Sequence, residues 1–259
     1  MDTHPGPDAA SQETQQPQMV RIPLPSVTPY VTYTLLGLTV FIYLVQAASL
    51  YLVGPAIYNI DWPSLWGEKI NALIRLGQFW RLITPVFLHG SVLHIAFNMY
   101  ALFIFGRGLE SRYGHLRFTA LYFLSALSGN VLSFVLTPEA SLGASTAIFG
   151  LITAEGIFLF QNRKLLGHRV ESAILNIVMV VVINLFFGMS PGVDNWGHVG
   201  GMLGGMLFAW FGGPRWKIEG TFPSLYLTDE RRGRGLLAGV AAVLLIFVPV
   251  AAAGWLWPV

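Results

Sequence analysis

Three short polar clusters stand out in an apolar sequence, and their residue types are those of nucleophilic catalysis. They are HGSVLHIAFN at 89–98, GASTAIFG at 143–150 and NWGHVGG at 195–201. A serine hydroxyl, such as that of Ser145, is a poor nucleophile until an adjacent base accepts its proton. A histidine, such as His198, supplies that base. The clusters therefore indicate hydroxyl chemistry, provided that the fold brings them together.

The composition indicates which class of protein must bring the clusters together. Of 259 residues, 54% are apolar and only 11% are charged, whereas about 25% are charged in an average soluble domain. So few charges cannot cover a soluble globule, which excludes a soluble enzyme, a disordered regulator and a nucleic-acid module. The chain contains no cysteine, which excludes disulfides, cysteine-ligated zinc and thiol catalysis.

Seven apolar stretches approach the roughly 20 residues that cross a bilayer. We expect helices over 30–53, 93–106, 116–136, 145–160, 171–188, 196–212 and 236–257, of which the second, fourth and sixth are short. The fold class is therefore an all-α polytopic membrane protein. We divide the chain into a disordered cytoplasmic tail (1–28), a six-helix catalytic core (29–213), a cytoplasmic linker (214–235) and a seventh transmembrane helix (236–259).

Basic residues predict the orientation of these helices. With the N-terminus inside, the inner segments contain twelve of the fifteen Lys and Arg residues and the outer loops contain three. This bias places the N-terminus in the cytoplasm and the C-terminus outside. All three polar clusters then lie on the outer side. The aromatic-rich loop at 54–92 is also outside, and we expect it to be a partly embedded interfacial segment.

Helix lengths and small residues predict how the clusters meet. Sixteen residues, from Ser145 to Phe160, span roughly 24 Å of helix, less than the hydrocarbon core of about 30 Å. Ser145 and His198 are therefore expected several Å below the outer surface. Glycines 197, 201 and 205 on one helix, and Ala147, Gly150 and Ala154 on the other, allow close approach. His94 and Asn98 share a helix face, and both can donate hydrogen bonds to an oxyanion.

In combination these motifs resemble the rhomboid intramembrane serine proteases, from about Gln78 to Gly213. The matching blocks are Trp80-Arg81, His89/His94/Asn98, Gly106/Leu109/Glu110, Gly143-x-Ser145 and His198-x-Gly200-Gly201. The resemblance implies a rhomboid-like six-helix core with an added seventh helix, and substrate entry between the second and fifth helices. It also implies a Ser145–His198 dyad, an oxyanion hole of His94, Asn98 and the Ser145 amide, Phe149 stacked on His198, and a structural His89.

The resemblance further implies the partners and the location of the chain. We expect it to cleave single-pass transmembrane proteins near the outer face, without cofactor, metal or nucleic acid, as a multi-pass protein of the plasma (inner) membrane. Two positions depart from the family pattern: Thr146 and Gly197 stand where Gly and Ala are usual. Because Thr146 is β-branched, we expect it to narrow the cavity beside Ser145.

Several other functions are compatible with parts of this sequence. Polar groups at membrane depth also mark transporters and channels, although here they stop about a third of the way in and no internal repeat is visible. The three cluster histidines would suit a metal site, but i, i+5 histidines do not share a helix face. A catalytically dead binding relative is a further alternative, but the intact Ser145 and His198 argue against it. If the chain is a protease, Asp194 is close enough to His198 in sequence to suggest a catalytic triad, but it lies in a loop and need not face the ring. We expect Glu155 to be a buried residue with a structural hydrogen bond.

Overall fold

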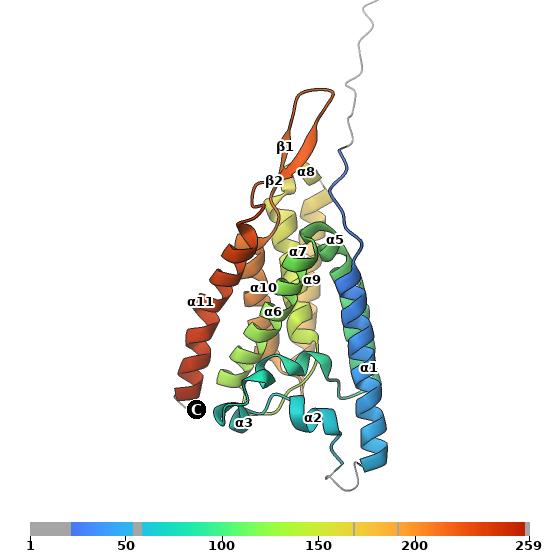
Figure 1. Cartoon of the computed structure of the whole chain (residues 1–259), viewed down its shortest axis with the longest axis vertical. Coiled ribbons are helices and arrows are strands. Elements are labelled where there is room, and N and C mark those ends of the chain that lie inside the picture. The colour runs from blue at the N-terminus through green and yellow to red at the C-terminus, as the bar shows by residue number, and fades with distance from the viewer. Residues whose placement is uncertain (1–21, 54–58, 168, 191, 257–259) are drawn as a thin grey trace, which may run out of the picture.

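Long helices run side by side along the longest axis of the molecule (Figure 1). The computed structural model describes residues 22–53, 59–167, 169–190 and 192–256. Most of the tail predicted at 1–28 lies outside these ranges, and residues 22–29 have no regular secondary structure. The helices of the bundle are α1 (Tyr30–Val53), α4–η4–α5 (Val92–Ala101, Leu102–Gly106 and Arg107–Tyr113), α6 (His115–Leu136), α7 (Ser145–Gln161), α9 (Arg169–Phe187), α10 (Asn195–Gly212) and α11 (Gly235–Leu256).

Five of these segments are long and apolar enough to cross a membrane: α1, α4–η4–α5, α6, α9 and α11. The α7 helix has 17 residues, and α10 begins with polar and glycine residues. Every predicted helix is present with bounds within two residues, except at the end of the second. The chain is therefore an all-α, multi-pass integral membrane protein, as the composition predicts.

The second spanning helix is longer than expected. It was predicted to end at residue 106, but it continues through a π-helical segment to Tyr113 and ends before Gly114, whose φ is +76°. Helix formation can continue past the apolar stretch because its charged residues have partners. Glu110 accepts hydrogen bonds from the Val31 and Thr32 amides, at 2.8 and 2.7 Å. It thereby caps the first turn of α1.

The core consists of α6, α7 and α10, packed with almost no space between their backbones. A Cβ on Gly201 would lie 2.0 Å from the carbonyl oxygen of Thr146, and one on Gly205 would lie 2.3 Å from that of Gly150. The glycine stripe thus brings α10 against α7, as predicted. A second stripe, which includes Gly200, approaches α6, where its Cβ would lie 2.5 Å from the Ser128 carbonyl oxygen.

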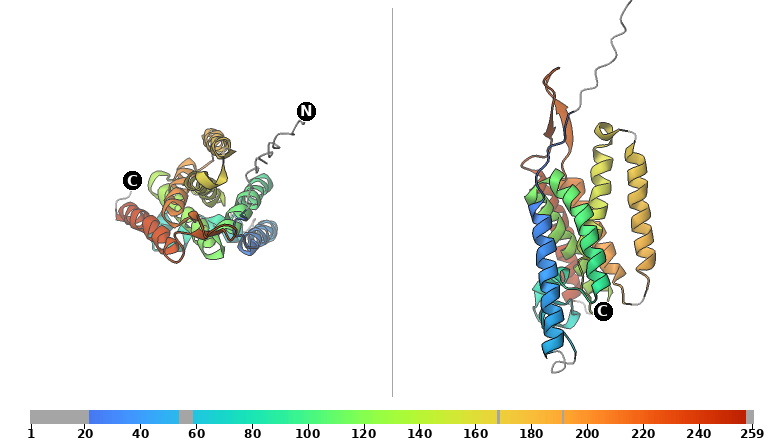
Figure 2. Two further views of the ribbon diagram at one scale, coloured as in Figure 1. Left: turned by 90° about the horizontal axis from the view of Figure 1, so that it is seen from above. Right: turned by 90° about the vertical axis from the view of Figure 1, so that its right-hand side faces the viewer.

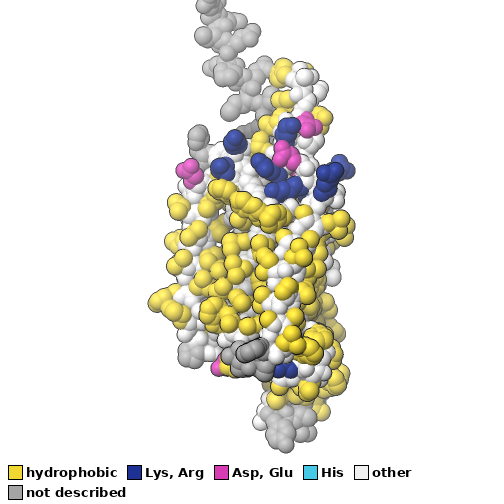
Figure 3. All heavy atoms as spheres, turned by 90° about the vertical axis from the view of Figure 1, so that its left-hand side faces the viewer, with side chains coloured by type: hydrophobic (Ala, Val, Ile, Leu, Met, Phe, Trp, Pro, Cys, Tyr) yellow, Lys and Arg dark blue, Asp and Glu magenta, His cyan; other side chains and the backbone are white. Residues whose placement is uncertain are grey.

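The outer helices are less tightly held. The α9 helix stands apart from the rest of the bundle (Figure 2), and only 6% of its most apolar window is buried. The α11 helix lies on the opposite side, against α6 and α10, where Gly239 closely approaches Gly212. On the face that Figure 3 draws, apolar side chains cover most of the surface between the two ends, as a lipid-facing surface requires.

The two ends of the bundle differ in charge and structure. Lys and Arg side chains gather at one end (Figure 3), where α8 (Arg163–Leu166) and an antiparallel hairpin of β1 (Trp216–Glu219) and β2 (Tyr226–Asp229) also lie. This hairpin occupies the segment that the sequence predicted only as a linker. Two short helices, α2 (Trp62–Gly67) and α3 (Asn71–Arg75), lie at the opposite end (Figure 1).

The first loop is folded around one buried guanidinium. It comprises α2, α3 and the single 3-10 turns η2 (Phe79–Leu82) and η3 (Thr84–Phe87), and none of these elements is long enough to span a membrane. Arg81 is 2% exposed. It donates to the Leu65 carbonyl at 2.6 Å, the Glu68 carbonyl at 2.7 Å and the Gln78 side chain at 2.7 Å. The Trp80-Arg81 motif therefore organises this loop.

Candidate active site

Ser145 occupies the first position of α7, and the backbone before it needs a glycine. Gly143 has a φ of +131°, and a Cβ there would lie 2.8 Å from His94 Nε2 and 3.7 Å from Ser145 Oγ. The Gly143 amide donates to the Pro85 carbonyl of the first loop at 2.9 Å. Gly143 therefore lets the chain turn into α7 while the His94 ring lies beside Ser145.

The serine and the histidine from separate helices meet. His198 Nε2 lies 2.9 Å from Ser145 Oγ, within hydrogen-bond distance. His198 is 8% exposed, and its ring stacks on Phe149, with centroids 4.3 Å apart and planes 22° apart. Phe149 follows Ser145 by one helical turn, so α7 carries both the hydroxyl and the ring that fixes the imidazole.

Asp194 does not complete a triad in this structure. It is the N-cap of α10, where it accepts a hydrogen bond from the Gly197 amide at 2.9 Å. Its carboxylate also accepts from the hydroxyls of Ser133 and Thr137 on and after α6. Among the described residues, His198 Nδ1 has no hydrogen-bond partner. Within the described part of the chain, Ser145 and His198 form a pair without an acidic residue that orients the ring.

The two histidines of the first cluster lie beside the turn into α7, and Asn98 lies one helical turn after His94. The rings of His89 and His94 meet edge to face, with centroids 5.0 Å apart. Asn98 is 7% exposed and donates one amide hydrogen to the His94 carbonyl at 3.1 Å, which leaves its second N–H available. His89 Nε2 accepts a weak hydrogen bond from the Ala144 amide at 3.4 Å. Burial first, and then the nearby His94, lower the pKa of His89 to about 3, so it is neutral.

The Thr146 side chain lies at the junction of α6 and α10. It is 6% exposed. A Cβ on Gly129 would lie 2.6 Å from Thr146 Cβ, and one on Gly197 would lie 3.2 Å from its Cγ2. Glycines at these two positions make room for the β-branched side chain, so it fills a helix interface.

The site is also held in place by residues that the sequence did not predict. Gln46 of α1 is 3% exposed, accepts from the His89 amide at 3.0 Å and donates to the Ser64 hydroxyl at 3.1 Å. It links α1, α2 and the loop before α4. Gln46 could have been noticed in the sequence as a polar amide within an apolar helix, because such groups are costly in a membrane unless they are paired. Nothing in the sequence indicated that Gly129 makes room for Thr146.

Glu155 is the structural residue that the sequence suggested. It forms a bidentate ion pair with Arg112, with contacts of 2.9 and 2.5 Å. The Arg112 guanidinium also lies over the Phe158 ring, 4.5 Å from its centroid. The pair joins α5 to α7 and takes no part in the serine–histidine contact.

One family model and several known proteins are similar to this chain. A family model described as "Rhomboid domain" matches residues 76–215. The chain is 41% identical over 145 residues to Rhomboid protease GluP of Bacillus subtilis (strain 168), which covers 56% of this chain and 28% of that protein. It is 38% identical over 144 residues to Rhomboid-like protease 1 of Toxoplasma gondii, covering 54% and 49%. It is 34% identical over 157 residues to RHOMBOID-like protein 4 of Arabidopsis thaliana, covering 60% and 39%.

The family match covers more than half of the chain and contains all three polar clusters. The chain therefore belongs to the rhomboid family. It spans less than half the length of each of the three relatives.

Proposed function

We propose that the chain is an intramembrane serine endopeptidase that cleaves transmembrane segments of other membrane proteins with a Ser145–His198 dyad. The observation that carries the proposal is the 2.9 Å contact between Ser145 Oγ and His198 Nε2. Family membership supports it, and so does the protease named in two of the relatives.

The proposed reaction is acyl transfer from a peptide bond to water. His198 Nε2 accepts the Ser145 hydroxyl proton while Oγ attacks the substrate carbonyl carbon. The resulting oxyanion accepts hydrogen bonds from His94, from the second N–H of Asn98 and from the Ser145 amide, which lies in the helix turn that lacks intrahelical partners. The imidazolium then protonates the leaving amine. Water, deprotonated by His198, hydrolyses the acyl-enzyme and regenerates the hydroxyl.

We further propose that the substrates are single-pass transmembrane proteins cleaved near the outer face. The site is built at the end of the bundle opposite the Lys and Arg cluster, and that cluster marks the cytoplasmic side by the positive-inside rule. The N-terminus is then cytoplasmic, the C-terminus is outside, and the membrane is the plasma (inner) membrane. A substrate helix must unwind locally, because a helical peptide bond is shielded and hydrogen-bonded. The loosely packed α9 supports entry between α4 and α9.

One variant of the serine and one of the histidine test the dyad. Purified protein is offered a model transmembrane substrate, and cleavage by wild type is compared with that by Ser145→Ala and His198→Ala. We expect both variants to lose cleavage. A fluorophosphonate should label wild type at Ser145, and it should label His198→Ala far more slowly because the base is missing. Undiminished cleavage by either variant would refute the proposed dyad.

A matched control separates lost chemistry from lost folding. Ser190 lies in the loop after α9 and is exposed, so Ser190→Ala should retain full cleavage and labelling. Cleavage that persists in Ser145→Ala but is abolished by a chelator would favour a metal site over the serine. A wild-type protein that folds but is neither labelled nor cleaves any substrate would instead be a catalytically dead relative.

A further inference from the structure

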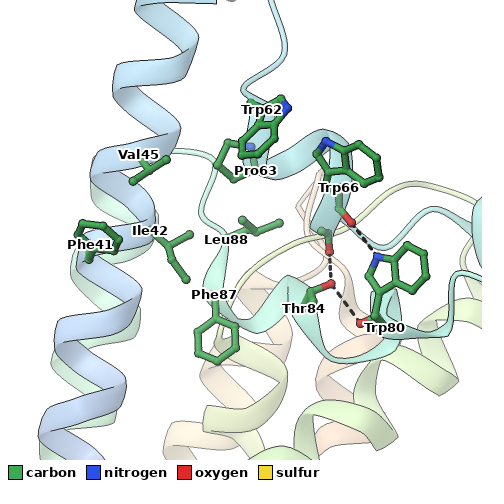
Figure 4. Close-up of a pocket in the computed structure, with 11 residues that line it drawn as sticks. Phe41, Ile42, Val45, Trp62, Pro63, Trp66, Trp80, Thr84, Phe87 and Leu88 are labelled. Atoms are coloured by element: carbon green, nitrogen blue, oxygen red, sulfur yellow. Dashed lines mark hydrogen bonds between the residues drawn. The ribbon is translucent and has the colours of Figure 1, made fainter.

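An apolar cavity of about 430 Å³ lies between α1 and the first loop. This volume is within the range of about 300–1,000 Å³ that ligand pockets occupy. Phe41, Ile42 and Val45 line it from α1, Trp62 and Trp66 from α2, and Phe87 and Leu88 from the end of the loop (Figure 4). The reaction proposed above uses none of these side chains.

The depth of the cavity places it at the level of lipid tails. Phe41 and Val45 lie eleven and fifteen residues after the start of α1, or roughly 16–23 Å along the helix, which is within a hydrocarbon core of about 30 Å. Trp62 and Trp66 lie together at one end of the cavity (Figure 4), and both are 58% exposed. Tryptophan at such a position is typical of the headgroup level. The cavity therefore runs from the headgroup level into the hydrocarbon.

The walls of the cavity select an uncharged apolar occupant. The Thr84 hydroxyl on the wall donates to the Gly67 carbonyl at 2.7 Å, and Trp80 Nε1 donates to the Trp66 carbonyl at 2.9 Å. These two polar groups are therefore already paired (Figure 4). None of the lining residues that the structure describes is charged. An apolar lining offers water few hydrogen-bond partners, and a carboxylate inside it would have no partner.

We propose that this cavity binds one acyl chain of an outer-leaflet phospholipid, with the headgroup beside Trp62 and Trp66. The cavity is continuous with the apolar band that the bundle presents to the bilayer, because Phe41 is both a lining residue and 62% exposed. An unfilled void would forfeit dispersion contacts on its lining. A tail that fills it restores those contacts at no desolvation cost, and packing of this kind drives association within membranes.

Lipid retention tests the proposal. Protein extracted from membranes is washed in detergent, and bound phospholipid is counted by native mass spectrometry. Wild type should retain one phospholipid. Ile42→Trp, which fills the cavity, should lose it, and so should Val45→Phe one turn later. Leu44→Trp is the matched control, because Leu44 is 61% exposed on the same helix and does not line the cavity. It should retain the lipid.

Photolabelling distinguishes a phospholipid from a free fatty acid as the source of the bound acyl chain. A phospholipid with a diazirine in its tail should label α1 and α2 in wild type, and this preference should disappear in Ile42→Trp. A free diazirine fatty acid should label these segments no better than the rest of the apolar band. Equal retention by all variants, or labelling spread evenly over the band, would overturn the proposal. Preferential labelling by the fatty acid would overturn the assignment to a phospholipid.

Discussion

Gly201 of α10 meets the backbone of Thr146 of α7 so closely that a Cβ on Gly201 would lie 2.0 Å from the Thr146 carbonyl oxygen. Thr146 follows Ser145, and Gly201 lies one helical turn after His198. The close approach of the two backbones therefore fixes the distance between the hydroxyl and the imidazole. No side chain at this position can be accommodated unless the helices separate.

Gly201→Ala should therefore abolish most of the activity although it touches neither reacting side chain. A misplacement of about 1 Å can cost about 100-fold in rate, and we expect a loss of at least about that size in substrate cleavage. Gly37→Ala on α1 is the control, because a Cβ there has nothing within 4 Å. Equal activity of the two variants would show that the helix contact does not position the dyad.

The Phe149 ring should contribute to the rate through its stacking on His198. An aromatic pair adds about 0.5–1.5 kcal/mol, so Phe149→Ala should slow cleavage by up to about tenfold. The rate of fluorophosphonate labelling of Ser145 should fall in parallel. Phe160→Ala is the control, because Phe160 stacks on Trp210 near the other end of α7. A fall of the same size in the control would refute a specific role of the stacking.

Asp194→Asn distinguishes a dyad from a triad. Loss of the orienting aspartate of a triad lowers kcat on the order of 10⁴-fold. Asp194 accepts from the Gly197 amide and the Ser133 hydroxyl, and an asparagine oxygen can still accept the first of these. We therefore expect the kcat of the variant to stay close to that of wild type. A collapse of kcat in a variant that still folds would assign Asp194 to the catalytic group.

Glu110→Gln should lower the stability of the protein. Glu110 is fully buried, and its carboxylate accepts from the Val31 and Thr32 amides and lies 2.6 Å from His115 Nδ1. Hydrogen bonds to a charged group contribute about 1.5–3 kcal/mol, and the amide loses part of this. Thermal unfolding in detergent should show a lower midpoint than for Glu171→Gln, whose side chain is exposed at the start of α9. Identical midpoints would mean that the cap of α1 is dispensable.

Lys69 should make stability depend on pH above neutrality. Its side chain is fully buried and donates to the Thr137 and Glu139 carbonyls, at 2.9 and 2.8 Å. Burial lowers the pKa of Lys69 from 10.5 to about 8, against the opposing attraction of Asp194, Glu139 and Glu68. Between these two values the unfolded chain binds more protons than the folded chain, so the contribution of Lys69 to stability rises with pH.

The measurement for Lys69 is the unfolding midpoint at several pH values from 7 to 10.5. The advantage of wild type over Lys69→Met should grow as the pH rises through about 8. Lys217→Met is the control, because Lys217 is largely exposed, and its difference from wild type should not change. A constant advantage over Lys69→Met would show that the ammonium is not destabilised in the folded state.

Composition and residue spacing were enough to predict the helices, their order and the candidate site residues. The spans follow from long apolar stretches, because backbone groups in a bilayer must be paired within a helix. The glycine stripe at 197, 201 and 205 predicted close packing of α10 on α7, because only small residues allow two backbones to approach. These are local properties of composition and spacing, and they can be read without coordinates.

The hydrogen-bond partners of the polar groups could not be predicted in this way, because they depend on how the helices pack. Asp194 caps α10, Glu110 caps α1 across 79 residues, and Thr146 fills the space left by Gly129. Gln46 holds the loop that carries His89. Each contact depends on the positions of two helices that are distant in sequence. Because a carboxylate, an amide or a hydroxyl can satisfy its hydrogen bonds in many ways, its partner is fixed only when packing brings one group within reach.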